Sequence, residues 1–301
     1  MKLANFKVLG ISDSVSATIP PGIKLIGADQ MWKTTKGDGL IAAIIDTGID
    51  INHPDLKQNI IDGISFVPGQ KPDYFIDENG HGTHVAGTIC ANGKILGAAP
   101  NAKILVVKVF GADGESSNDC IARGFKYAAD WRGPNGETVD VINASLGGPQ
   151  PDKQLEDAIK YCVNKGILCC CAAGNEGDGV MNTFEYSYPA MYSDACSIGA
   201  IDFNLKAAKF TNANNEVDVS APGYSIVSTY MGSKYAELSG TSMATPHVTG
   251  MALLYIGKFM IRFGRKPLEN ELFTLLKALT RDIEEAGIDP DTGAGLIQQW
   301  I

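Results

Sequence analysis

Short apolar runs alternate with amphipathic segments along most of the chain. The apolar runs are rich in Val and Ile, as strands buried on both faces are, and they occupy residues 40–45, 104–110, 139–143, 167–173 and 196–201. The amphipathic segments at residues 119–131 and 153–164 predict helices, and Gly166 follows the second where helices commonly end. This alternation predicts an α/β fold with a mainly parallel central sheet flanked by helices.

The first 18 residues differ from this pattern. They hold few large apolar residues, become rich in Ser and Thr over residues 12–18, and lead into Pro20 and Pro21. A chain of 301 residues is long for one domain, yet parallel α/β folds often exceed 200 residues as one unit. We therefore predict an N-terminal extension over residues 1–18 and one domain over residues 19–301.

Composition and charge exclude several classes of protein. The chain is 45% hydrophobic and 20% charged, which fits a folded protein and excludes a disordered one. The net charge is −9 and the chain has no basic run. Binding to nucleic acid depends on basic side chains that release counterions from the phosphate backbone, so this composition does not favour it. We expect no nucleic acid and no membrane among the partners.

The cysteines and the start of the chain bear on the compartment. There are seven cysteines, an odd number, and three of them are adjacent at Cys169, Cys170 and Cys171, where disulfide geometry is unfavourable. They are expected to be reduced core residues. The chain also begins without the apolar segment of a signal peptide. Both features predict a cytoplasmic protein.

The candidate catalytic residues lie in clusters of small residues, near the ends of predicted strands and helices. His81 lies between Gly80 and Gly82, which let a substrate approach an imidazole that acts as a general base. Ser242 lies where a loop enters an apolar helical stretch, at the positive end of the helix dipole. A serine needs such a base to become a nucleophile, and the base needs an acid to hold its tautomer.

The acid and an electrophilic group come from two predicted strand ends. Asp46 directly follows a buried apolar run, so its carboxylate can be desolvated and aimed. Asn175 follows another run, and its amide can donate to a developing oxyanion. The sequence thus supplies an acid, a base, a nucleophile and an oxyanion donor.

Four blocks of sequence resemble the signatures of the subtilisin family of serine proteases: Asp46-Thr47-Gly48, His81-Gly82-Thr83-His84, Asn175 and Gly240-Thr241-Ser242-Met243-Ala244. The order Asp, His, Ser is the one known for subtilisins. The resemblance implies that Ser242 attacks the scissile carbonyl, that His81 moves the proton, and that Asp46 orients His81. Asn175 and the Ser242 amide would form the oxyanion hole.

The same resemblance implies how a substrate binds. Protein and peptide substrates would add as a strand between two segments of this chain, through backbone hydrogen bonds that ignore side-chain identity and give broad specificity. The implied substrate-binding residues are Gly114, Glu115, Ser116, Ser145, Leu146, Gly147, Ala173 and Gly174. The chemistry itself would need no cofactor.

Among subtilisins the chain is most similar to the intracellular branch, because of its acidic charge, its short extension and its Pro-Pro-Gly-Ile-Lys segment. In that branch the extension lies across the active site and inhibits the enzyme until it is removed. We expect residues 1–18 to do so here, and the resemblance also implies a homodimer.

The resemblance raises two structural cation sites, for Ca²⁺ or Na⁺. In the first, Asp55 matches a ligand, but Lys94 enters the loop and Ala17 stands at a glutamine position, so this calcium site is not expected to be kept. The second would combine Asp202 with backbone carbonyls, and it is the site expected to hold a cation. Its carbonyls would come from Ala190, Tyr192 and Ala195.

Three other interpretations remain to be weighed. One is a catalytically silent subtilisin-like fold that binds peptides. Another is a secreted protease whose leader is missing from the sequence. The third is a metal pair made by His81 and His84, although no flanking carboxylate or cysteine has the spacing of a zinc motif.

Overall fold

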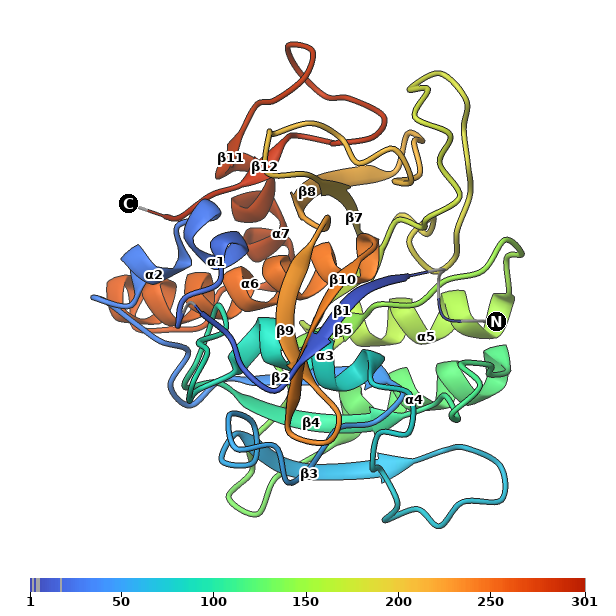
Figure 1. Ribbon diagram of the computed structural model, residues 1–301, viewed down its shortest axis with the longest axis vertical. Coiled ribbons are helices and arrows are strands. Elements are labelled where there is room, and N and C mark those ends of the chain that lie inside the picture. The colour runs from blue at the N-terminus through green and yellow to red at the C-terminus, as the bar shows by residue number, and fades with distance from the viewer. Residues whose placement is uncertain (2, 4–5, 17, 301) are drawn as a thin grey trace.

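A mainly parallel sheet of nine strands crosses the part of the chain that the computed structural model describes, which is residues 1, 3, 6–16 and 18–300 (Figure 1). Within it β11 runs antiparallel to its neighbour β12. In spatial order the strands are β11 (Thr280–Arg281), β12 (Leu296–Ile297), β8 (Val217–Pro222), β7 (Cys196–Ile201), β6 (Leu168–Ala172), β5 (Val141–Ala144), β2 (Ile41–Asp46), β4 (Lys103–Lys108) and β3 (Ile60–Ser65).

Helices cover both faces of this sheet. Successive residues of β2 point to opposite sides, so Ile41 and Ile45 pack among side chains of α4 and α5, whereas Ile44 packs among those of α3 and α6. The helices are α1 (Pro21–Leu25), α2 (Ala28–Met31), α3 (His81–Cys90), α4 (Asn118–Asp130), α5 (Lys153–Asn164), α6 (Thr241–Phe263) and α7 (Glu269–Ala278). The predicted α/β architecture of a sheet between two helical layers is confirmed.

The element boundaries differ from the predicted ones in a few places. The helix predicted over residues 153–164 is α5 itself, but the strand predicted over 104–110 ends at Lys108. The amide of Val109 makes the last ladder bond, to the carbonyl of Asp46 at 2.9 Å, and the amide of Phe110 turns back to the same carbonyl at 3.3 Å, so the pairing ends. The strand predicted over 139–143 begins at Val141, after the Asp140 carboxylate has accepted the amide of Ile41.

A second, smaller sheet lies over the end of the molecule that carries α3 and the start of α6. It consists of β1 (Lys7–Ser12), β10 (Lys234–Ser239) and β9 (Ile226–Tyr230) in that order, all antiparallel. The blue β1 lies beside the orange hairpin of β9 and β10 in Figure 1. The sequence pattern predicts an extension over residues 1–18 but no strand within it.

The described residues also bear on the cysteines and on membranes. All seven cysteines are buried free thiols, as predicted. Burial raises the pKa of the Cys90 and Cys171 thiols far above the ordinary value, which keeps them protonated. In the part of the chain that the structure describes, no helix combines the length and apolar character that a bilayer crossing requires.

Candidate active site

Asp46 and His81 are in direct contact at the carboxyl end of β2. Asp46 is the last residue of β2, and its buried carboxylate accepts the amide of Thr47 through Oδ1 at 2.8 Å. The same oxygen lies 2.8 Å from Nδ1 of His81, the first residue of α3. Because a carboxylate accepts hydrogen bonds, this contact places the imidazole hydrogen on Nδ1 and leaves Nε2 as the acceptor.

Ser242 is the second residue of α6 and is buried. Its Oγ donates to the carbonyl of Ser145 at 3.1 Å. Nε2 of His81 is also buried and meets no hydrogen-bond partner among the described residues. The hydroxyl therefore points at the predicted substrate strand.

Phe6 shows that His81 and the start of α6 face the same space. Its ring centroid lies 4.9 Å from that of His81. A Cβ built on Gly240, two residues before Ser242, would lie 3.6 Å from Cβ of Phe6. One side chain of the N-terminal extension thus contacts both halves of the candidate catalytic group.

Asn175 lies beside α6 with its amide oriented. Its Oδ1 accepts the backbone amide of Thr241 at 2.8 Å and the Thr241 hydroxyl at 2.9 Å. These two bonds fix the oxygen end of the side chain, so the NH₂ end faces away from Thr241. Gly174, just before it, has a φ of +110°, and a Cβ there would lie 2.2 Å from Nδ2 of Asn212. Only glycine fits that position.

The two predicted substrate segments face a stretch of the extension. Leu3 donates its amide to the carbonyl of Gly114 at 2.9 Å, and Met1 exchanges two backbone hydrogen bonds with Ser116 at 2.9 and 3.0 Å. On the other side, a Cβ built on Gly148 would lie 3.6 to 3.8 Å from Met1 side-chain atoms. Residues 1 and 3 thus occupy the place that the sequence analysis gave to a substrate.

The segment around Ser145 is tied to α6 by buried polar groups. Ser145 Oγ donates to the carbonyl of Ser242 at 2.9 Å and accepts the side-chain amide of Asn143 at 2.9 Å. The oxygen of that amide accepts the Thr249 hydroxyl at 2.9 Å. These hydrogen bonds fix the position of the predicted substrate strand relative to α6.

Asp77 is a structural residue of the site that the sequence analysis missed. Its buried carboxylate accepts the backbone amides of Asn79, Gly80 and Thr83 and the hydroxyls of Thr47 and Thr83. It thereby joins the first turn of His81's helix to the residue after Asp46. An aspartate a few residues before an expected helix is the signal that could have found it.

Lys108 is a second missed residue. It is fully buried at the end of β4, opposite Asp46 in the parallel register. Its Nζ donates to the carbonyl of Ile76 at 2.6 Å and to the Glu78 carboxylate at 2.9 Å, which lowers the pKa of Glu78. The ammonium therefore fixes the segment on either side of Asp77.

His84 and His247 contact backbone carbonyls rather than His81. Nε2 of His84 donates toward the carbonyls of Ile226 and Ala236, at 3.0 and 3.2 Å. Burial lowers the pKa of His84 to about 3, so the ring is neutral at pH 7. Burial also lowers the pKa of His247 to about 4, and its Nδ1 lies 2.8 Å from the carbonyl of Met243.

The residues of the first predicted cation site are engaged elsewhere. Asp55 accepts the amides of Lys94 and Ile95 and the hydroxyl of Tyr235, at 2.8, 3.1 and 2.9 Å. Its oxygens thus close the loop that calcium would otherwise hold, and the site does not fit a metal. Ala17, the other position considered, lies outside the described residues.

The second predicted cation site stays a prediction, and its carboxylate has hydrogen-bond partners within the protein. The Asp202 carboxylate accepts hydrogen bonds from its own turn, from Asn204 and from the amide of Lys206. The carbonyl of Tyr192 accepts the amide of Ala195 at 2.8 Å, while Ala190 is buried. Among the described residues no group of three or more His, Cys, Asp or Glu side chains has the arrangement of a metal site.

A hydroxyl at a helix start, an imidazole held by a buried carboxylate and an oriented amide are the groups that acyl transfer needs. Fold and site together are those of a serine hydrolase. The Subtilase family profile matches residues 37–282. The chain belongs to the subtilase family.

Three relatives illustrate this membership. An intracellular serine protease of Paenibacillus polymyxa is 46% identical over 264 residues, 86% of this chain and 79% of that protein. The major intracellular serine protease of Bacillus subtilis (strain 168) is 45% identical over 275 residues, or 89% and 84% of the two chains. Subtilisin Savinase of Lederbergia lenta is 45% identical over 241 residues, or 79% and 84%. The protein is a subtilisin-like serine protease.

Proposed function

We propose that the chain cleaves peptide bonds through an acyl-enzyme formed on Ser242. Ser242 Oγ attacks the scissile carbonyl while Nε2 of His81 takes its proton, which then passes to the leaving amine. Asp46 keeps the imidazole in the right tautomer and stabilises the imidazolium. Water then attacks the ester by the same route and frees Ser242. The 2.8 Å contact between Asp46 Oδ1 and His81 Nδ1 carries this proposal.

Asn175 and the backbone amide of Ser242 would bind the oxyanion. The amide lies in the first turn of α6, where the backbone N–H groups are free of intrahelical partners. The side chain of Asn175 is oriented by Thr241 before any substrate arrives. Because the donors are fixed in advance, they cost no reorganisation when charge develops.

Peptide hydrolysis by matched variants tests these roles. The protein without residues 1–18 should cleave casein, and Ser242→Ala and His81→Ala should abolish cleavage. Asn175→Ala should lower kcat by about 10²–10³-fold, a magnitude known from this same family rather than worked out from this structure. Ser193→Ala, which changes an exposed serine, is the control. An Asn175→Ala enzyme with full kcat would remove the oxyanion assignment.

Substrates would bind as an added strand between the two segments that hold Met1 and Leu3. Contacts to Gly114 and Ser116 are backbone hydrogen bonds, so we propose broad specificity. Glu115 belongs to the same wall as Gly114 and Ser116. On the other wall we assign the remaining predicted residues, Ser145, Leu146, Gly147, Ala173 and Gly174. Gly147 is closely packed, since a Cβ there would lie 2.2 Å from Oγ of Ser187.

The extension would inhibit the uncut protein. Support comes from residues 1, 3 and 6, which lie on the predicted substrate segments and on His81. A truncated protein that starts at Ile19 should therefore be more active than the full chain. Equal activities, with the extension shown to be intact by mass, would overturn the inhibitory role.

We base the proposed compartment on the names of two relatives and on the state of the cysteines. Two relatives are named intracellular proteases, and the cysteines are unpaired thiols. The cytoplasm is the compartment that this proposal assigns.

The end of α6 exposes Ile261 and Phe263, with Leu268 just beyond, which favours a homodimer. An Ile261→Asp variant that leaves the mass in solution unchanged would argue against that interface.

The silent peptide-binding module is the weaker alternative. The relatives are named proteases, and Asp46, His81, Asn175 and Ser242 are all retained. It would become the better interpretation if the protein without its extension bound peptides but failed to cleave them.

A further inference from the structure

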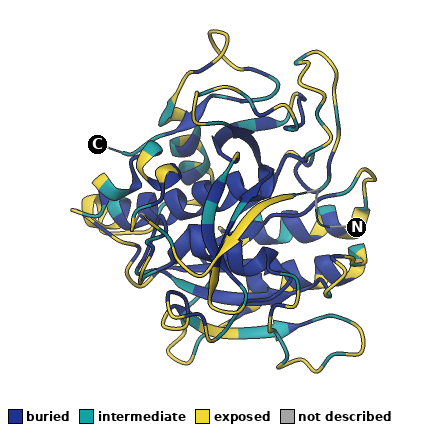
Figure 2. Cartoon of the chain, viewed as in Figure 1, coloured by how far each residue is buried: buried dark blue, intermediate teal, exposed yellow. Residues whose placement is uncertain are grey.

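A glycine interrupts one face of the small sheet. Gly10 of β1 stands opposite Glu237 of β10, and Glu237 stands opposite Val227 of β9. Opposed residues of paired strands have their side chains on the same face, so this row lacks its third side chain. A Cβ built on Gly10 meets no atom within 4 Å, and Figure 2 shows β1 as an exposed, yellow arrow. Space is therefore left beside Glu237.

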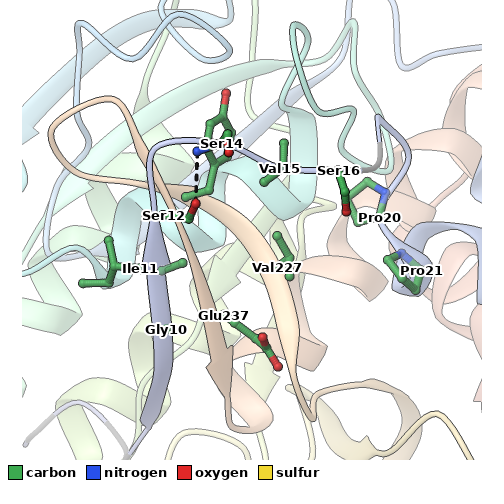
Figure 3. Close-up of a pocket in the computed structure, with 12 residues that line it drawn as sticks. Gly10, Ile11, Ser12, Ser14, Val15, Ser16, Pro20, Pro21, Val227 and Glu237 are labelled. Atoms are coloured by element: carbon green, nitrogen blue, oxygen red, sulfur yellow. Dashed lines mark hydrogen bonds between the residues drawn. The ribbon is translucent and has the colours of Figure 1, made fainter.

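A cavity of about 350 Å³ occupies this space (Figure 3). Half of the residues that line it belong to the extension, and the rest come from the Pro20–Pro21 turn and the β9–β10 hairpin. The apolar residues of the lining are Ile11, Val15, Pro20, Pro21, Val227 and Ala236. Because one wall is the extension itself, the cavity exists while the extension is attached and docked, and removal of residues 1–18 opens it.

Glu237 is the one charged residue of this lining in the part of the chain that the structure describes. Two other polar groups of the lining are already paired. The hydroxyl of Tyr235 donates to Asp55 at 2.9 Å, and Ser12 Oγ accepts the amide of Ser14 at 3.1 Å. The half-buried carboxylate of Glu237 has no hydrogen-bond or ion-pair partner among the described residues. Beside apolar walls, such a carboxylate is stabilised when a cation reaches it.

We propose that this cavity binds a small organic amine. The ammonium group pairs with the Glu237 carboxylate, and the hydrocarbon part packs between Val15 and Val227. An anion would be repelled by Glu237, and a neutral apolar molecule would leave the carboxylate unpaired. The net charge of −9 also favours a cation over an anion.

Such an amine would act on the extension as well as bind to it. The ligand needs both walls of the cavity, so it stabilises the docked extension against the undocked one. Phe6 belongs to the same extension and lies on His81, with 4.9 Å between the ring centroids. The amine would therefore strengthen inhibition of the uncut protein. This consequence rests on the proposed inhibitory role of the extension, whereas binding of the amine does not.

Calorimetric titration with hexylamine, an ammonium ion at pH 7, tests the site directly. The host is full-length Ser242→Ala, with its extension shown to be attached by mass. Hexylamine should bind at least about tenfold more weakly when Glu237→Gln is added, because the charge-assisted hydrogen bond is lost. Removal of residues 1–18 should weaken binding as much, and so should Gly10→Val, which places a side chain in the cavity. 1-Hexanol, which lacks the charge, should bind the host as weakly.

Asp13→Asn is the matched control for charge. Asp13 belongs to the same extension, its side chain is 90% exposed, and it does not line the cavity. The affinity for hexylamine should therefore be unchanged in this variant. Equal binding with and without residues 1–18 would overturn the proposal. So would an effect of Asp13→Asn as large as that of Glu237→Gln, because the amine would then respond to the general negative charge.

Residual activity separates the site from the inhibitory role. Hexylamine at ten times its Kd should raise the ratio of docked to undocked extension about tenfold. Activity of the intact wild type on a peptide should fall by that factor, while the enzyme that starts at Ile19 should keep its activity. Equal inhibition of both proteins would place the amine in the substrate-binding region and overturn the proposal. Binding as predicted with no loss of activity would support the site and contradict the proposed inhibition by the extension.

Discussion

Replacing Gly10 should tighten the hold of the extension on the candidate active site. Gly10 lies within β1, its backbone does not require a positive φ, and a Cβ there meets no neighbouring atom within 4 Å. We choose Gly10→Val, because valine favours strands and Gly10 lines a cavity of about 350 Å³ between residues 10–16, Pro20, Pro21 and the β9–β10 hairpin. The substitution therefore affects the extension when it is docked and leaves the packing of residues 19–300 unchanged.

The magnitude follows from two contributions. Glycine within a strand costs roughly 0.5–1 kcal/mol relative to alanine, because it loses more backbone freedom when it becomes ordered. Two further methyl groups, half buried in an open cavity, add about 0.8 kcal/mol. The sum of about 1.5 kcal/mol raises the ratio of docked to undocked extension by about tenfold. Residual activity of the uncut protein should fall by the same factor.

The assay compares residual activities of intact chains. Full-length wild type and Gly10→Val are assayed on a chromogenic peptide, with the protein that starts at Ile19 as the uninhibited reference. Mass spectrometry before and after shows whether the extension is still attached. Asp13→Asn is the control, since Asp13 and Lys234 are exposed, 3.9 Å apart, and contribute little. An intact Gly10→Val chain as active as wild type would refute the reasoning.

Three further predictions concern the scaffold of the site. Asp77→Ala should lower kcat of the extension-free enzyme by about tenfold or more at similar KM, because His81's helix loses its anchor, and Asp77→Asn should partly restore it. Tyr235→Phe should cost about 1–2 kcal/mol in urea unfolding, because Asp55 loses a donor. Burial lowers the pKa of His247 to about 4, so stability should fall by up to about 3 kcal/mol as the pH drops from about 6.5 to 4; His247→Leu should flatten that part of a pH-dependent melting curve, and an unchanged slope would contradict it.

Much of this fold could be predicted from the pattern of the chain. The strands of the parallel sheet are continuous apolar runs because both of their faces are covered, and α5 shows its apolar face and its Asp152 cap in the sequence. Boundaries were less accurate where side chains or turns compete with the ladder. Residues 109–110 are apolar enough for a strand, but the amide of Phe110 turns back to the carbonyl of Asp46, which already accepts the amide of Val109.

The antiparallel hairpin and β1 were harder to predict. β1 has exposed side chains and a central glycine, so neither an apolar run nor a two-residue period marks it. It is a strand because β10 offers it an edge, which is a tertiary effect. The expectation that residues 1–18 lie across the active site came from resemblance alone.

In the candidate site, too, some residues could be identified from the sequence and others only from the structure. Asp46, His81, Asn175 and Ser242 stand in recognisable motifs, and Asp46 and His81 are in contact. The supports of the site could not be read in that way. A lysine at the end of an apolar strand would be expected to face solvent. The structure instead shows that Lys108 is buried and that its ammonium donates to the carbonyl of Ile76.

The central claim is that Ser242 is the nucleophile activated by His81. The most direct measurement is labelling of the extension-free protein with a fluorophosphonate, followed by mass spectrometry of its peptides. We predict one adduct, on Ser242, that forms in the wild type and is absent from Ser242→Ala and from His81→Ala. An adduct on another serine, or labelling that persists without His81, would contradict the account.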